Sequence, residues 1–192
     1  MGYRRKNGML RGHGAFATWG LALYDRIQRA RVMGGVCRAG NLSSENDGAA
    51  AVVIMSRNRV ETLGLSPMAK SLSFTVAGAD PGKAYETVPR AVSKALDRAG
   101  LSMEQMDLIE IQEAFAAQVL ADLKQMGVGR KDFGSINVNG SGTSLGHPIA
   151  CTGTRVLVSM VHEMQRRYAR YGLECICGGG GLGIAAVIEL VR

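Results

Sequence analysis

From Gly40 onward the sequence alternates short apolar runs with longer amphipathic segments, and this alternation limits the folds that the chain can adopt. The runs with the length and composition of strands are 49–55, 70–77, 106–111, 135–138, 173–177 and 184–190. The segments with helical spacing of apolar residues are 56–63, 85–99, 113–126 and 149–168. Strands that alternate with helices predict a layered α/β domain, in which the last two strands form an antiparallel hairpin around a glycine run.

The segment 149–168 is the longest of the expected helices, and Pro148 suits its first turn. The residues expected on its inner face are Leu157, Met160, Val161, Met164 and Tyr168. In the segment 85–99, Pro89 likewise falls in the first turn, and Gly100 supplies a C-terminal stop.

The composition excludes several classes of protein. A chain of 192 residues, 46% of them hydrophobic, can bury the core of one domain or one and a half. No run of eighteen apolar residues is present, so we expect no membrane span. The basic N-terminus lacks the apolar core of a secretory signal, which indicates a cytoplasmic protein with reduced thiols. The four cysteines follow no zinc-binding pattern, so we expect no metal site.

Positive charge is concentrated at the start of the chain. The formal net charge is +7, and residues 1–35 contribute +6 of it, through seven Lys and Arg residues against Asp25. The stretch 19–32 also has the spacing of a short helix. A single basic segment without a recognisable module is weak support for a nucleic-acid binder, so we expect no nucleic-acid partner.

One histidine stands in a glycine-rich turn, at the end of the sequence Gly-Ser-Gly-Thr-Ser-Leu-Gly-His-Pro over residues 140–148. The turn needs glycine because several of its residues must leave the usual backbone regions. At the start of a helix, the helix dipole favours the neutral imidazole of His147. A neutral ring can accept a proton from a thiol or donate a hydrogen bond to a developing oxyanion. A histidine that only caps the helix is the alternative.

A thiol stands beside a second glycine run. Cys177 ends an apolar strand and precedes four glycines, whose unshielded backbone amides can point at a substrate oxygen, as an oxyanion hole requires. A thiol whose pKa is lowered by its neighbours can act there as base and acid. Cys175 lies two residues earlier on the same strand face, so composition does not separate the two. A buried cysteine in a tight turn is the structural alternative.

Gln112 stands at a junction between an expected strand and an expected helix. Its amide can hold a water or a carbonyl group there, and it can equally cap the helix.

Four blocks of the sequence resemble motifs of the thiolase family, the acyl-CoA Claisen enzymes. Residues 40–50 resemble G-N-x-S-x-x-N-D-G-A-A, and residues 112–118 resemble (N/H)-E-A-F-A-A-Q. Residues 137–155 resemble N-x-x-G-x-x-x-x-x-G-H-P-x-x-x-x-G-x-R, and residues 177–183 resemble C-x-G-G-G-x-G. The blocks stand in the family's order, and the resemblance covers residues 38–192.

The resemblance implies the chemical roles of three matched residues. His147 corresponds to the histidine that activates the nucleophile and helps to bind the thioester oxygen. Cys177 corresponds to the acid–base cysteine that removes the α-proton of an acyl-CoA, and it is preferred to Cys175 because only Cys177 stands six residues before Gly183. Gly179 corresponds to a backbone amide of the second oxyanion hole.

The resemblance also implies the substrate. Ser43, Ala114 and Phe115 correspond to residues along the pantetheine arm of coenzyme A, a thin and mostly apolar group that small residues and a ring suit. The coenzyme A thioester is the substrate, so no resident cofactor is expected.

The sequence departs from the family pattern at two points. The family has Asn or His where this chain has Gln112, and that residue positions a catalytic water. Nothing in residues 1–37 resembles the block that carries the family's nucleophilic cysteine. The resemblance therefore divides the chain into an unmatched basic segment at 1–37, the last strands of the family's N-terminal domain at 38–82, and a complete C-terminal domain at 83–192. The fold implied is a thiolase-like mixed sheet covered by helices.

Three functions follow as hypotheses. The first is a thiolase-type acyltransferase of fatty-acid metabolism, inactive alone, that interconverts acyl-CoA plus acetyl-CoA with CoA plus 3-oxoacyl-CoA. The second is a non-catalytic thiolase-like module that binds acyl-CoA or a partner chain. The third is a nucleic-acid binder that uses residues 1–35. Because strands without sheet neighbours expose apolar faces, we expect a homo-oligomer or a complementing N-terminal thiolase chain.

Overall fold

A computed structural model describes residues 36–38 and 40–191 of the chain. All the elements described below belong to the unit Ala39–Arg192. Residues 1–35, which include most of the net charge and the short helix expected at 19–32, lie outside the described part.

Four strands form one mixed sheet. They are β1 (Ala69–Gly78), β2 (Leu108–Ile111), β3 (Tyr171–Gly178) and β4 (Leu182–Leu190), in the spatial order β1-β4-β3-β2. β4 pairs antiparallel with both β1 and β3, whereas β2 runs parallel to β3. The last two strands therefore form the expected hairpin.

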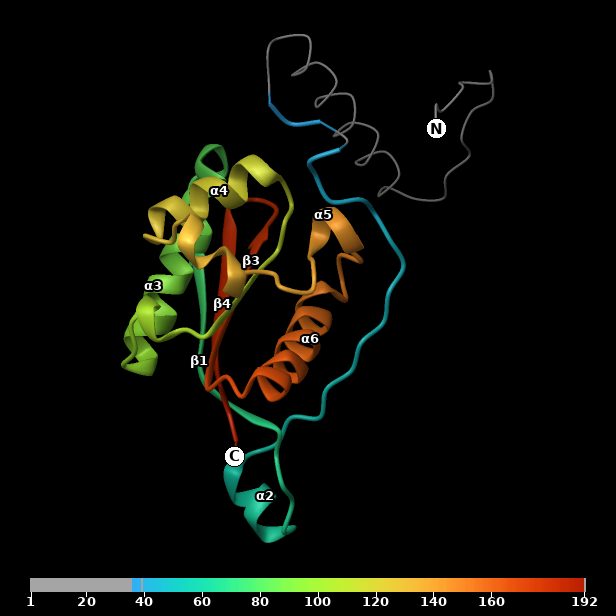
Figure 1. Ribbon diagram of the computed structural model, residues 1–192, viewed down its shortest axis with the longest axis vertical. Coiled ribbons are helices and arrows are strands. Elements are labelled where there is room, and N and C mark those ends of the chain that lie inside the picture. The colour runs from blue at the N-terminus through green and yellow to red at the C-terminus, as the bar shows by residue number, and fades with distance from the viewer. Residues whose placement is uncertain (1–35, 39, 192) are drawn as a thin grey trace. The chain divides into compact units, whose positions relative to one another are not determined.

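Helices cover both faces of this sheet (Figure 1). α3 (Thr87–Ala99) and α4 (Ala116–Gln125) pack on one face, and α6 (Thr152–Arg167) packs on the other. The shorter elements are α2 (Arg57–Thr62), α5 (Gly142–Leu145) and the 3-10 helices η1 (Pro81–Glu86), η2 (Met103–Gln105) and η3 (Arg130–Ser135). The expected α/β class, with a mixed sheet covered by helices, is thus confirmed. Gly100 ends α3 in the left-handed conformation, at φ +66°.

Three of the sequence-based expectations are wrong. The apolar run 49–55 is not a buried strand, because no described residue pairs with it, and Val53 is 88% exposed. The run 135–138 forms only a single bridge, between Ile136 and Ile109. Tyr168 does not face inward: it ends α6 at φ +56° and is 83% exposed.

Three ionisable side chains lie between α6 and the sheet. Glu110 on β2 and Glu174 on β3 are partners in the parallel register, and both are buried. Burial raises the pKa of Glu110 to about 7, and burial together with the charge of Glu110 raises the pKa of Glu174 to about 8. Arg155 on α6 lowers both values, but it is one cation for two carboxyl groups. The cluster therefore favours a state in which protons remain on the carboxyl groups.

Glu174→Gln should reduce the loss of stability that rising pH causes. The folded-state pKa of Glu174 lies above its ordinary value of 4.5, so the folded chain keeps a proton that the unfolded chain has already lost. The free energy of unfolding should fall between about pH 5 and pH 8, and the substitution should lessen that fall by on the order of 2 kcal/mol. Urea unfolding at about pH 5.5 and pH 8.5 measures this effect. Glu61→Gln, on the exposed surface of α2, is the control, and an identical pH dependence in Glu174→Gln and wild type would contradict the expectation.

Candidate functional site

An extended segment, residues 41–46, joins the first matched block to the second. The backbone N–H of Ser43 donates to the carbonyl of Ala114 at 3.1 Å. Leu42 pairs with Phe115 in an antiparallel bridge, and Phe115 is the N-cap residue of α4. The three residues expected along a pantetheine arm, Ser43, Ala114 and Phe115, are therefore brought together by backbone hydrogen bonds.

The same segment holds His147 in the turn that precedes α6. The backbone N–H of His147 donates to the carbonyl of Ser44 at 2.8 Å. The imidazole Nδ1 lies 2.7 Å from Oγ1 of Thr152, and that hydroxyl donates to the carbonyl of Pro148 at 3.1 Å. A threonine hydroxyl has one proton, so with the proton directed at Pro148 the oxygen accepts from Nδ1–H. This tautomer leaves the lone pair of Nε2 free to act as a base.

The surroundings of His147 favour the neutral ring. Burial lowers the pKa of His147, and the nearby charge of Arg155 lowers it further. Pro148 does not lie in the first helical turn, because α6 begins at Thr152. Its carbonyl instead accepts the backbone N–H groups of Cys151 at 2.7 Å and Thr152 at 2.9 Å, which fixes the turn before the helix.

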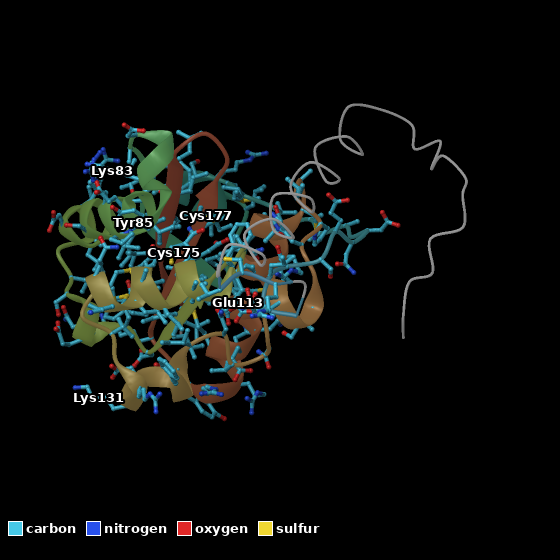
Figure 2. The ribbon with its side chains drawn as sticks, turned by 90° about the horizontal axis from the view of Figure 1, so that it is seen from above. Lys83, Tyr85, Glu113, Lys131, Cys175 and Cys177 are labelled. Carbon is cyan, nitrogen blue, oxygen red and sulfur yellow. The ribbon has the colours of Figure 1, made fainter. Side chains whose placement is uncertain are left out.

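The two cysteines of β3, Cys175 and Cys177, are labelled in Figure 2, and they differ in exposure. Cys175 is fully buried, and burial raises its pKa well above the ordinary range. Cys177 is half-buried near the end of the strand. Burial raises the pKa of Cys177, a hydrogen bond with the Gln118 side chain lowers it, and the Asp122 carboxyl raises it. Cys177 is therefore the thiol that a substrate can reach.

The turn after Cys177 is built from glycine for a conformational reason. Gly180 and Gly181 have φ values of +82° and +84°, a region that side chains disfavour. The carbonyl of Gly181 accepts the N–H of Ala79 at 2.9 Å, which ties the turn to the end of β1. A Cβ on the exposed Gly179 would meet no atom within 4 Å, so space beside this backbone is open.

Gln112 lies where β2 leaves the sheet. Its backbone N–H donates to the carbonyl of Cys175 at 3.0 Å, which continues the parallel ladder by one step. The side chain is buried close to Gly142 and Ser43, since a Cβ on Gly142 would lie 2.5 Å from Gln112 Nε2 and 3.0 Å from Ser43 Cβ. Within the described residues both ends of the Gln112 amide are buried and have no hydrogen-bond partner, which is unusual for a buried polar group.

Sequence reasoning did not single out Glu113, which is labelled in Figure 2 and whose hydrogen bonds link the glycine-rich turn to β2. Its carboxylate accepts from Asn137 Nδ2 at 2.9 Å and from the backbone N–H of Thr143 at 3.0 Å. Asn137 in turn bonds to both backbone groups of Ile111, at 2.8 and 2.9 Å. The sequence feature that could have identified Glu113 is a carboxylate just after a buried strand. Glu113 thus fixes the turn that precedes His147.

These contacts gather the expected site residues at one end of the sheet. β2 and β3 are parallel, so their carboxyl ends lie together. Gln112 directly follows β2, and Cys177 lies near the end of β3. His147 is connected to the same end through Ser44 and the neighbouring Ser43. Ligands of α/β proteins commonly bind at the carboxyl ends of parallel strands. The catalytic roles of these residues remain predictions.

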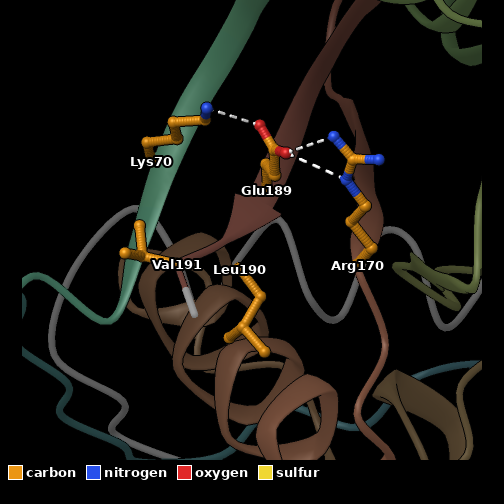
Figure 3. A pocket seen from close by; sticks show the side chains of 5 residues that line it. All are labelled: Lys70, Arg170, Glu189, Leu190 and Val191. Carbon is orange, nitrogen blue, oxygen red and sulfur yellow. Dashed lines mark hydrogen bonds and ion pairs between the residues drawn. The ribbon is translucent and has the colours of Figure 1, made fainter.

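A charged surface pocket lies at the opposite end of β3 and β4 and is not part of this site (Figure 3). Its volume is about 340 Å³, and it is lined by Lys70, Arg170, Glu189, Leu190 and Val191. Glu189 pairs with Lys70 at 2.6 Å and with Arg170 at 3.0 Å, so one carboxylate is shared by two cations.

Two further observations concern only the described residues. They contain no group of three or more His, Cys, Asp or Glu side chains arranged to hold a metal ion. None of their helices combines the length and the apolar character needed to cross a membrane.

Comparisons with known proteins give one consistent result. Residues 65–190 match the family described as "Thiolase, C-terminal domain". The chain is 42% identical to the 3-ketoacyl-CoA thiolase of Bacillus subtilis over 168 residues, which are 88% of this chain and 42% of that protein. It is 49% identical to the acetyl-CoA acetyltransferase of Pseudomonas aeruginosa over 154 residues, or 80% of this chain and 38% of that one.

Solved structures agree. Human mitochondrial 3-ketoacyl-CoA thiolase in complex with CoA superposes with a TM-score of 0.78 at 39% identity, over 82% of this chain and 39% of that one. The Bacillus anthracis acetyl-CoA acetyltransferase gives a TM-score of 0.78 at 44% identity, with the same coverage. The chain thus spans about two-fifths of the length of these relatives. By its sequence and its fold, the chain belongs to the thiolase family.

Proposed function

We propose that this chain provides the acid–base half of a thiolase-type acyltransferase, which interconverts acyl-CoA plus acetyl-CoA with CoA plus 3-oxoacyl-CoA. The observation that carries the proposal is the 2.7 Å contact between His147 Nδ1 and Oγ1 of Thr152, whose proton is directed at the Pro148 carbonyl. We infer from it the tautomer that carries its proton on Nδ1 and its lone pair on Nε2. A neutral imidazole with a free Nε2 can take the proton of a thiol nucleophile.

Each remaining residue then has one task. Cys177 removes the α-proton of the acyl-CoA in the condensation direction and returns it in thiolysis. The backbone N–H of Gly179 stabilises the thioester oxygen as it gains negative charge, and the unpaired amide of Gln112 holds a water at the same end of the sheet. Ser43, with Ala114 and Phe115, lines the pantetheine arm.

The nucleophilic thiol must come from elsewhere. Ping-pong acyl transfer needs a nucleophile as well as an acid–base group. The family's nucleophile block has no counterpart in residues 1–37, and about three-fifths of each relative's length lies outside the part that this chain matches. We propose that a complementing thiolase chain supplies the block, that the 192-residue polypeptide alone has negligible turnover, and that the pair works in cytoplasmic fatty-acid metabolism.

Cys177→Ala should abolish acyl transfer in the complemented protein. The chain is co-expressed with the part of the Bacillus subtilis relative that it does not match, and thiolysis of acetoacetyl-CoA by CoA is followed. Loss of the acid–base group should lower kcat by roughly 10²–10⁴-fold. Cys37→Ala, ahead of the first matched block, is the control and should retain the wild-type rate. Turnover that survives Cys177→Ala would rule out the assignment.

A second measurement isolates the step assigned to Cys177. The α-protons of acetyl-CoA should exchange with D₂O when the complemented protein is present, and NMR follows this exchange without any condensation. Exchange should fall with Cys177→Ala and persist when the nucleophile of the complementing chain is replaced.

The exposed apolar surface supports a partner chain. The run 49–55 is exposed throughout, and within the described residues it pairs with no strand. Phe74 and Val76 on β1, with Ile184 on β4, lie on neighbouring strands and are 58%, 50% and 38% exposed. An apolar run with no polar alternation is typical of a strand buried on both faces. We propose that 49–55 adds to a sheet of the complementing chain.

The alternative function is a non-catalytic thiolase-like module that binds acyl-CoA or a partner. The same exposed run favours it, because binding to another chain needs no catalytic residue. The activity assay separates the two: a stable complex without turnover supports the module.

Val53→Lys together with Ile54→Lys should prevent association with the complementing chain. These side chains are 88% and 84% exposed in this chain, so the change should leave its own fold intact, whereas a charge inside a partner's sheet is costly. Analytical ultracentrifugation of the mixture measures the complex. Leu120→Lys, an exposed apolar residue of α4, is the matched control. If the double variant still binds the complementing chain, 49–55 is not the contact. If it only abolishes self-association, the occupant is a second copy.

A further inference from the structure

Asp122 is a carboxyl group inside the apolar layer between α4 and the sheet. It is 1% exposed and lies on the face of α4 that buries Val119 and Leu123. Its Oδ1 has no hydrogen-bond partner within the described residues, and its Oδ2 accepts from Gln118 Nε2 at 3.5 Å. A carboxylate in such a place is costly, and burial accordingly raises the pKa of Asp122 to about 7. A core position that packing alone decided would hold an apolar residue.

The neighbours of Asp122 are thiols. Gln118, one helical turn earlier on α4, donates to Asp122 at 3.5 Å, and a hydrogen bond from the same amide lowers the pKa of Cys177. An amide NH₂ has two donors, so it can serve the sulfur and the carboxyl group together. Val119 and Leu123, which share the buried face of α4 with Asp122, pack in one cluster with Cys175 and Cys177 of β3. The charge of Asp122 accordingly raises the pKa of both thiols.

We propose that Asp122 is a positioning residue for Cys177: it fixes the Gln118 amide against the sulfur and places beside that sulfur a charge that opposes thiolate formation. A thiolate formed against this charge is a stronger base, which suits removal of an α-proton. That consequence rests on the function proposed above, whereas the effect on the thiol itself does not.

The other groups near Cys177 do not supply this charge. Among the described residues, the buried face of α3 is uncharged, with Thr87 its most polar member, and the β4 residues that face this layer are Ala185 and Val187. On β3, Cys175 is a fully buried thiol. Glu110 and Glu174 lie on the opposite face of the sheet, beside Arg155, and their charges raise the pKa of Cys175, whereas the carboxyl group that raises the pKa of Cys177 is Asp122.

The geometry predicts opposite effects for two substitutions. Asp122→Asn keeps an acceptor for Gln118 but removes the charge, so the Cys177 thiolate should form more easily. Gln118→Met removes the amide donor but keeps the charge, so the thiolate should form less easily. A residue that served only to fill space would not produce shifts of opposite sign.

The test is alkylation of the full chain by iodoacetamide between about pH 6.5 and pH 10.5. Only the thiolate reacts, and mass spectrometry of the peptides reports each of the four cysteines separately. The midpoint of the Cys177 profile should move down by roughly 0.5–1 pH unit in Asp122→Asn and up in Gln118→Met. Asp97→Asn, the same change at an exposed position of α3, should leave the midpoint where it is.

A Cys177 midpoint that stays in place or rises in Asp122→Asn would overturn the proposal. If either variant fails to fold, wild-type protein labelled with ¹³C-aspartate gives the second measurement. Alkylation of Cys177 should move the Asp122 carboxyl signal, and an unchanged signal would overturn the proposal equally. Neither experiment uses an acyl-CoA, so a failed acyltransferase assay and a failed Asp122 test are distinct results.

Discussion

The parallel register of β2 against β3 determines where every candidate side chain can lie. Ile111 stands opposite Cys175, and the backbone N–H of Gln112 extends the ladder by one hydrogen bond to the carbonyl of Cys175. A slip of one residue would exchange the two faces, turning Cys177 toward α6 and Glu174 toward α4. Because both strands run the same way, their carboxyl ends meet, and the segments that follow them share one end of the sheet. The pairing of β2 with β3 therefore determines where the motif residues of the site meet.

Each of the two candidate catalytic groups has a buried charge on its own side of the sheet. On the α6 side, Arg155 lies among two buried carboxyl groups and lowers the pKa of His147. On the α4 side, Asp122 raises the pKa of Cys177. Both effects favour the uncharged form, so imidazole and thiol rest as a neutral base and a neutral acid. A site in this state can pass a proton in either direction without first breaking an internal ion pair, which suits a reversible acyl transfer.

The regular elements were predictable where a periodic pattern coincided with a hydrogen-bonding partner. The helix expected at 85–99 and the strands expected at 70–77 and 184–190 correspond to α3, β1 and β4 within a few residues. The run 49–55 has the composition of a strand but no described neighbour, and strand formation depends on the neighbour.

The run 135–138 failed for a different reason. The side chain of Asn137 takes both backbone groups of Ile111 that a strand partner would have used, and its own φ of +46° breaks the extended conformation.

The site was partly predictable, because motif residues and the residues that control them leave different signals. His147 and Cys177 stand beside glycine runs that the sequence displays openly. Gln118 closes the matched block 112–118, but no role was expected for it, and Asp122 is a single polar residue within an amphipathic helix to which sequence reasoning assigned only its apolar face. The position of Asp122 was nevertheless informative: it follows Phe115 by seven residues, which is two helical turns, and so falls on the buried face. A carboxyl group at such a position must meet a polar partner, a proton or a reactive group, and in this fold the nearby reactive group is a thiol.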